Sequence, residues 1–204
     1  STGVEVGMEN TVFFEKKLFL TPLDFNRLKT QTVDEILLKK AHELLDGKCS
    51  EHGFVVPGSL NILSRSMGYF EAARFTGDAV YYVKLEGGVI YPVEGHQVVG
   101  EVIRKNKMGL YVNYKNAIRI QVPRDLHLDN QKYDEIEVGE FIRVELKRSK
   151  FAVYDPYILA SGLFIEQADE ENQDDEDEED EEDEEDEEDE EDEEDEEDEE
   201  DEEE

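Results

Sequence analysis

Aromatic and cationic side chains recur together between residues 105 and 150, in a combination suited to holding single-stranded nucleic acid. Aromatic rings stack on unpaired bases, and lysine or arginine neutralises phosphates, so the two types together bind a strand with little regard to its sequence. The candidate RNA-binding residues are Lys105, Lys107, Tyr111, Tyr114, Lys115, Arg119, Lys147 and Arg148. Residues 95–150 hold 11 basic and 8 acidic side chains, so we expect weak, salt-sensitive binding.

Each candidate also has an ordinary structural explanation. Successive residues of a strand point to opposite faces, so Tyr111 and Tyr114 cannot both face solvent unless a bulge intervenes. One of the two is therefore expected in a hydrophobic core. For each lysine, a solvated surface charge that binds nothing is the more common role.

The sequence shows no catalytic constellation. Cys49 and His52 have a spacing found in zinc sites, but no second pair follows, and the other histidines, His42, His96 and His127, are scattered. No Walker-type glycine loop is present. We therefore expect a protein that is not an enzyme, with no catalytic residues, no metal and no cofactor, and with Cys49 buried as a small side chain.

Strand patterns after residue 95 would position the candidate RNA-binding residues. We expect five strands, at 98–103, 110–114, 117–122, 139–147 and 157–163. The polar stretch 123–137 is expected to be a loop between the third and fourth strands. Five short strands with a long connection at that point match a small closed barrel of the OB type.

The N-terminal half predicts one main helix against an antiparallel sheet. Thr32 followed by Glu35 forms a capping box before an apolar pattern of helical period over 33–45, and Gly47 stops it. Strands are expected at 12–20, where Thr21-Pro22 ends the run, and at 53–57, 60–63, 80–85 and 89–91, with Gly87-Gly88 as a turn. The fold class is therefore α+β.

The C-terminal segment 166–204 is a separate compositional region. It holds 35 of the 57 acidic residues and no base, and Asp174 to Glu204 are all acidic, so residues 1–165 are almost neutral although the chain carries −36. Like charges with no apolar side chains to bury predict a disordered acidic tail. It could be a solubilising tail, a lure for basic proteins, or a nucleic-acid mimic that competes for a basic groove; it should weaken RNA binding at low salt.

Bulk composition limits the remaining possibilities. A single cysteine excludes an internal disulfide framework and suits a reducing compartment. No apolar run approaches the ~20 residues that span a bilayer, and no secretory signal is visible at the N-terminus, so we expect no membrane association. The expected domains are 12–94, 95–165 and the tail 166–204.

Two sets of residues resemble a known family. Gly95-x-x-Val98-Val99-Gly100-x-Val102, Lys107-Met108-Gly109-Leu110-Tyr111-Val112 and Val138-Gly139-Glu140-Phe141-Ile142-Arg143-Val144 resemble an S1-type RNA-binding domain. Upstream, Leu18-Phe19-Leu20-Thr21-Pro22, Leu45-Asp46-Gly47-Lys48-Cys49-x-x-x-Gly53-Phe54-Val55-Val56 and Val83-Lys84-x-x-x-x-Val89-x-x-Pro92 resemble the larger, S1-domain-bearing stalk subunit of multisubunit DNA-dependent RNA polymerases of archaea, eukaryotes and large DNA viruses. The resemblance covers roughly 13–164; the acidic tail is not a family feature.

The resemblance implies a non-catalytic subunit whose N-terminal tip domain docks on the polymerase core while the barrel contacts nascent single-stranded RNA. It implies RNA polymerase core subunits as partners, and a smaller stalk subunit across the junction of tip and barrel. The expected location is the nucleus in a cellular eukaryote, or the cytoplasmic viral factory and virion of a large DNA virus. Phe13, Phe14, Phe19 and Phe25 are the candidate docking residues, unless all four are core.

Two other functions remain open at this point. The first is an S1-type RNA-binding protein of translation or RNA decay, which would need the barrel but not the tip. The second is a chaperone or interaction protein for basic partners, in which the acidic tail carries the function.

Overall fold

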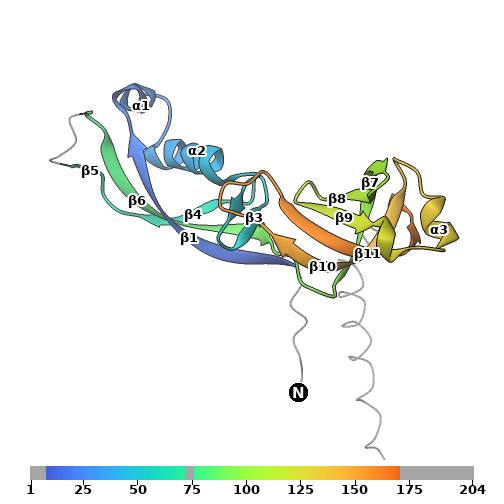
Figure 1. Cartoon of the computed structure of the whole chain (residues 1–204). Helices are drawn as coiled ribbons and strands as arrows, with labels where there is room; N and C mark the ends of the chain where they lie inside the picture. The colour runs from blue at the N-terminus through green and yellow to red at the C-terminus, as the bar shows by residue number, and fades with distance from the viewer. Residues whose placement is uncertain (1–7, 72–75, 171–204) are drawn as a thin grey trace, which may run out of the picture.

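The computed structural model describes residues 8–71 and 76–170, which form an N-terminal sheet-and-helix domain, called the tip from here on, followed by a closed five-stranded barrel (Figure 1). The two domains lie end to end, with α1 and β5 at one extremity and the barrel at the other. The expected α+β class with a closed barrel of five strands is confirmed. None of the helices among the described residues is long and apolar enough to cross a membrane.

The tip sheet is built on two long strands. β1 (Glu9–Leu20) pairs antiparallel with β6 (Ala79–Ile90) along its whole length. Three short strands, β3 (Gly53–Val55), β4 (Asn61–Arg65) and β5 (Tyr69–Phe70), pair with the other edge of β6, and β2 (Cys49–Ser50) pairs with β3. β6 is therefore the central strand of the tip.

The continuity of β6 corrects the expected turn at Gly87-Gly88. A Cβ on Gly87 would lie 2.7 Å from Cδ2 of Leu60, a fully buried residue of the tip core. Glycine is needed here so that a neighbouring side chain can approach the strand, which is a common reason for glycine within a sheet. The residue pair therefore serves packing and does not reverse the chain.

Helix α2 (Val33–Leu45) has the predicted bounds and the predicted cap. The Thr32 hydroxyl accepts a hydrogen bond from the Glu35 amide at 3.2 Å, and the Glu35 carboxylate accepts one from the Thr32 amide at 3.1 Å. Its buried residues are Ile36, Leu37, Ala41 and Leu45. This apolar face packs on the tip sheet, so that α2 covers the tip core.

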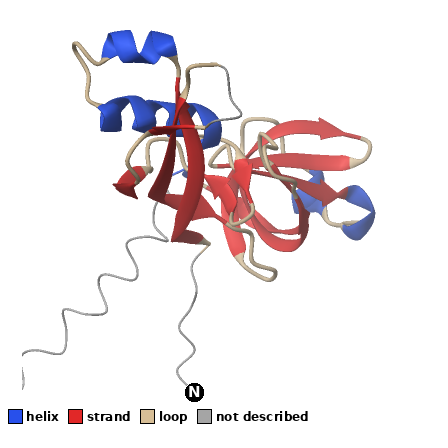
Figure 2. Cartoon of the chain, turned by 90° about the vertical axis from the view of Figure 1, so that its left-hand side faces the viewer, coloured by secondary structure: helices blue, strands red, loops and turns tan. Residues whose placement is uncertain are grey.

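Helix α1 (Pro22–Arg27) was not expected, because Pro22 was interpreted only as the end of a strand. Proline is well suited to the first position of a helix, where its missing N–H is no loss. Thr21 precedes it as N-cap and forms a second capping box with Asp24. Figure 2 shows both longer helices on the tip domain, apart from the short helices of the barrel.

The barrel closes in the order β7, β8, β9, β11, β10 and back to β7. Its strands are β7 (Gln97–Asn106), β8 (Gly109–Tyr114), β9 (Ile118–Pro123), β10 (Phe141–Lys150) and β11 (Ile158–Ala168). β9 and β11 are parallel, and every other neighbouring pair is antiparallel. The expected polar loop 123–137 contains two short helices, η1 (Arg124–Leu126) and α3 (Gln131–Asp134).

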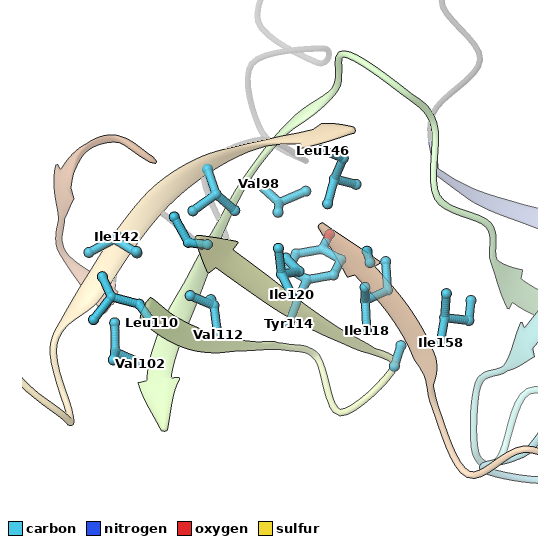
Figure 3. Close-up of a cluster of buried hydrophobic side chains, with 14 of the residues drawn as sticks. Val98, Val102, Leu110, Val112, Tyr114, Ile118, Ile120, Ile142, Leu146 and Ile158 are labelled. Carbon is cyan, nitrogen blue, oxygen red and sulfur yellow. The ribbon is translucent and has the colours of Figure 1, made fainter. Parts of the chain in front are cut away.

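The barrel interior is filled by alternate residues of every strand. Val102, Leu110, Val112, Ile120 and Ile142 are completely buried and meet inside the barrel (Figure 3). Their strand neighbours point outward, as the period of two requires. The outward residues are thus the ones available to a ligand.

His127 holds the short helices against the barrel. Its ring stacks on Tyr133 with centroids 4.6 Å apart, its Nε2 accepts a hydrogen bond from the Phe164 amide at 2.9 Å, and its Nδ1 lies 2.6 Å from the Pro123 carbonyl. An amide N–H can only donate, so Nε2 is unprotonated and Nδ1 carries the proton. The neutral imidazole therefore connects β9 to β11.

Tip and barrel share hydrogen bonds and a core. The Cys49 amide donates to the Asp155 carbonyl and the Tyr154 amide donates to the Cys49 carbonyl, both at 2.8 Å. Phe54 and Ile90 of the tip belong to the same buried cluster as the barrel core. Burial of the Cys49 thiol, and secondly the nearby charge of Asp155, raise its pKa to about 11. The two domains form one packed body.

The boundary of the expected acidic tail differs in the structure. Residues 166–168 belong to β11, where Glu166 pairs with Arg143 and Ala168 with Phe141, so the barrel ends three residues beyond 165. The predicted disorder concerns a segment of which 171–204 lies outside the described residues.

Candidate nucleic-acid interface

A groove of about 480 Å³ lies on the outer face of the barrel, over β8, β9 and β11 and beside the end of β10. Strand register explains its floor, because Tyr111 pairs with Gln121 on β9 and Gln121 pairs in turn with Ser161 on β11. These three residues form a row across neighbouring strands, while Val112 and Ile120 beside them point into the core. The row of partly exposed polar side chains is thus fixed by the barrel itself.

All the charged side chains that line the groove are cationic. Arg119, Arg148 and Lys150 line it, and none of its lining residues is acidic. No carboxylate in the described part of the chain forms an ion pair with any of these three cations. These unneutralised charges therefore give the groove a positive electrostatic potential, which would attract an anion.

Arg119 is held in place but is not saturated. Its guanidinium lies over the ring of Tyr157, 4.9 Å from the centroid. Its Nε atom is buried and has no hydrogen-bond acceptor among the described residues. A buried donor without an acceptor costs about 1–3 kcal/mol. The Nε atom has almost no accessible surface, so Arg119 would act on a ligand in the groove through the charge of its guanidinium.

Tyr111 adds an aromatic surface beside these charges. Its ring is half-buried on β8, and the guanidinium of Arg104 lies 5.3 Å from its centroid. A tyrosine in this setting can stack on a base while the neighbouring cations contact phosphates. The groove therefore combines the two residue types that single-strand binding requires.

Three of the predicted RNA-binding residues meet in the groove: Tyr111, Arg119 and Arg148. Tyr114, three positions along β8 from Tyr111, is buried in the barrel core, as expected for one member of that pair. Lys115 follows at the β8–β9 turn, where its ammonium lies 5.5 Å from the centroid of the Tyr114 ring.

The remaining three predicted lysines lie elsewhere. Lys105 donates hydrogen bonds to the carbonyls of Asp134 and Ile136, at 2.9 and 2.8 Å, and so fastens the α3 region to the barrel. Lys147 is paired with Glu145, two residues away on the same face of β10, at 2.8 Å. Lys107 is exposed at the turn between β7 and β8. The partners of Lys105 come from a distant part of the sequence, whereas same-face spacing could have indicated the pairing of Lys147 with Glu145.

Six residues that line the groove were not predicted: Gln121, Ser149, Lys150, Leu159, Ala160 and Ser161. Gln121 follows Arg119 by two positions and Lys150 follows Arg148 by two, so same-face spacing along a strand could have found both. Leu159, Ala160 and Ser161 reach the groove only because β11 pairs parallel to β9. No local pattern in the sequence indicates that pairing.

The four predicted docking phenylalanines are dispersed over the tip. Phe14 is 3% exposed and belongs to the tip core, which corrects its assignment as a contact residue, whereas Phe13, on the opposite face of β1, is 68% exposed. Phe19 is half-buried, and Phe25 on α1 packs beside Phe70 with centroids 6.4 Å apart. Exposed apolar residues that the prediction omitted gather near α1 and β5: Leu23, Met67, Tyr69 and Phe70.

Within 8–71 and 76–170, no three histidine, cysteine, aspartate or glutamate side chains are placed to hold an ion. Comparison with known protein families finds none that matches this chain, and comparison with curated proteins finds no relative. The evidence on function is therefore the geometry of the groove and of the two joined domains.

Proposed function

We propose that this chain is a non-catalytic stalk subunit of a DNA-dependent RNA polymerase. Its tip domain docks on the polymerase core, and the groove of its barrel holds single-stranded RNA as the transcript emerges. The observation that carries the proposal is the cationic groove without acidic residues, on a barrel that is rigidly joined to a tip with exposed apolar side chains.

The strand order supports an OB-type barrel. Counted from β7, the strands close in the order 1-2-3-5-4-1, with the third and fifth parallel and short helices between the third and fourth. OB-type barrels bind oligonucleotides on the face of strands 2 and 3, beside the 1–2 and 4–5 connections. The groove occupies this position, over β8 and β9 and next to the segment that leads from β10 to β11.

The number of groove contacts sets the expected affinity. Three cations would neutralise about three phosphates, and for single strands the logarithm of affinity then falls with the logarithm of salt with a slope of roughly −2. One tyrosine would stack a single base without selecting it. Such a site fits RNA of changing sequence that passes over the protein during transcription.

The joint between tip and barrel favours the stalk over the two alternatives. An RNA-binding protein of translation or decay would need the barrel only, yet here the tip contributes Met8, Phe54 and Ile90 to the barrel cluster. A chaperone that acts through its acidic tail would need no cationic groove. A smaller stalk subunit across the junction of tip and barrel remains part of the proposal.

Affinity purification tests the proposal. The tagged protein would be isolated from its native cells after nuclease treatment, and its partners identified by mass spectrometry. Near-stoichiometric large subunits of an RNA polymerase are expected. Ribosomal, RNA-decay or histone-like proteins in their place would overturn the stalk assignment. Retention after nuclease treatment shows that the partners bind the protein itself and not shared nucleic acid.

A further inference from the structure

The chain carries both a cationic groove and a long run of acidic residues, and the groove lies on the strand from which that run continues. β11 contributes Leu159, Ala160 and Ser161 to the groove and ends at Ala168. The run of acids begins six residues later, at Asp174, and extends to Glu204. We infer that the acidic segment 174–204 binds in the barrel groove and competes there with RNA.

Distance permits this contact. Seven residues separate Ser161 from Ala168, which along a strand is roughly 23 Å. An extended chain covers that distance in about seven residues, so a backbone that reverses direction after Ala168 returns to the groove well before its end. All acids of the run beyond the first few lie within reach, and many registers of binding are equivalent.

Charge complementarity selects the groove among the surfaces of the protein. Residues 1–165 carry 22 acidic and 21 basic side chains, so the folded part has no general attraction for a polyanion. Arg119, Arg148 and Lys150 form a cationic site without an internal carboxylate. A glutamate or aspartate carboxylate in the groove meets these cations as a partner of opposite charge.

Covalent attachment makes a weak contact effective. A ligand carried on the same chain meets its site at an effective concentration on the order of millimolar. A groove that binds the acidic run with a dissociation constant of about 0.1 mM is then occupied most of the time, and RNA affinity falls about tenfold. RNA binds the groove more tightly when a basic partner binds the acidic segment and so removes it from the groove. The acidic segment therefore lowers the RNA affinity until such a partner is present.

The effect on RNA rests on the proposed function, whereas the docking of the acidic segment does not. The two are therefore tested separately. Cys49 is the only cysteine, is 2% exposed and has a pKa raised to about 11, so a cysteine introduced as Glu190→Cys can be labelled alone with a nitroxide. Paramagnetic broadening of backbone amides then reports where the acidic segment resides.

Docking predicts localised broadening in the full chain. The amides of Tyr111, Gln121 and Ser161 should broaden at about 50 mM salt and recover at about 500 mM, while those of Ala41 and Leu45 in α2 stay sharp throughout. Adding Arg148→Glu with Lys150→Glu should abolish the broadening. Uniform or absent broadening would overturn the docking.

A matched charge change separates the groove from net charge. Lys39→Glu with Lys132→Glu reverses two exposed helical cations outside the groove and should leave the broadening unchanged. Loss of broadening in this variant would show that the acidic segment follows overall charge, which would also overturn the inference.

The RNA arm compares the full chain with a variant in which every Asp and Glu of 174–204 is replaced by Asn or Gln. Fluorescence anisotropy with a labelled oligouridylate of about 15 nucleotides should show about tenfold tighter binding by the neutral variant at low salt, and less than about twofold at high salt. Equal affinities would overturn the competition and leave RNA binding intact. Localised broadening with no RNA binding by either protein would overturn the proposed function and leave the docking intact.

Discussion

The tip domain and the barrel each carry a hollow lined by cations and tyrosine, and the two hollows treat those cations differently. The hollow on the tip, of about 610 Å³, lies over β1, β4 and β6 and includes Lys16, Lys17, Arg65, Lys84 and Tyr82. Three of its four cations are paired with carboxylates: Lys17 with Glu71, Arg65 with Asp34, and Lys84 with Glu15. The barrel groove has three cations and no acidic lining residue.

The tyrosines of the two hollows differ in the same way. Tyr82 stacks on Tyr69 with centroids 6.1 Å apart, and a hydrogen bond to Tyr82 is the main reason that the pKa of Tyr69 is raised to about 12. Each ring also has a cation over it: Lys17, which is already paired with Glu71, lies 6.0 Å from the centroid of Tyr82, and Arg104 lies 5.3 Å from that of Tyr111. The number of cations on a surface therefore does not identify an anion-binding site; what matters is whether the protein already neutralises them.

The largest expected effect separates the two hollows by charge reversal. Arg148→Glu with Lys150→Glu should weaken binding of single-stranded RNA about 30-fold and flatten its salt dependence, because two phosphate contacts become repulsive. The matched change in the tip, Lys17→Glu with Lys84→Glu, should alter the affinity less than about twofold. Anisotropy titrations in the background with a neutral acidic segment measure both. An equal loss of RNA affinity in the two variants would show that the two hollows do not differ as RNA-binding surfaces.

Removal of the aromatic ring should give the next largest effect. Tyr111→Ala deletes the surface on which a base would stack and should weaken RNA binding about tenfold, with an unchanged salt slope. Tyr82→Ala, in the tip hollow, should change the affinity less than about twofold, because Tyr69 already stacks on the ring of Tyr82 in place of a base. The same titration compares the two alanine variants. A loss with Tyr82→Ala as large as that with Tyr111→Ala would show that RNA contacts the tip.

Paired charges on the tip should contribute to the free energy of unfolding, whereas the unpaired charges of the groove should not. Burial alone would raise the pKa of Asp24, but the Lys40 ammonium at 2.9 Å and the hydrogen bonds from Thr21 outweigh it, so the pKa is lowered. Asp24→Asn should cost about 1 kcal/mol of unfolding free energy at neutral pH. Arg148→Ser with Lys150→Ser should stay within about 0.5 kcal/mol of the parent.

The pH dependence of the Asp24 contribution follows from the direction of the shift. A depressed pKa in the folded state means that the stabilisation is complete above the unfolded value near 3.8 and disappears as pH falls through the lower folded value. Denaturant titrations of the parent and Asp24→Asn should therefore differ at pH 7 and converge in stronger acid. A difference that persists below both pKa values would assign the effect to packing instead of charge.

The smallest expected effect comes from making the tip hollow resemble the groove by removing the carboxylates that pair with its cations. Glu15→Gln with Asp34→Asn removes the partners of Lys84 and Arg65 and should raise RNA affinity about threefold at low salt. Glu43→Gln with Asp125→Asn changes the net charge equally at exposed positions outside the hollow and is the matched control. An identical gain in both variants would trace the effect to overall charge.

Local patterns in the sequence predicted local structure well. The capping box of Thr32 and Glu35 and the helical period gave α2 its observed bounds, and alternation located all five barrel strands. Pro22 was misinterpreted because the same residue can end a strand or begin a helix. Gly87 was misinterpreted because its role depends on Leu60, which the fold brings close from a distant part of the sequence.

The candidate site was predicted only in part, for the same physical reason. Tyr111, Arg119 and Arg148 have the residue types and the outward positions that a groove needs. Lys105 and Lys147 are cationic like the two arginines. However, the ammonium of Lys105 donates to the Ile136 carbonyl and that of Lys147 pairs with Glu145, so neither lines the groove. The partner of Lys105 is distant in sequence and could not be predicted, whereas the pairing of Lys147 with Glu145, two positions away, could have been expected from same-face spacing.

The barrel is closed by the last strand that the structure describes, and this sets the order in which a chain under synthesis acquires its parts. β11 inserts between β9 and β10, so before residues 158–168 leave the ribosome both neighbours have an unpaired edge. The groove also waits for this event, because Arg119, Arg148 and Ser161 come from the three strands that it joins. A chain whose translation stops early therefore lacks the groove, and closing the barrel and completing the groove are one late step.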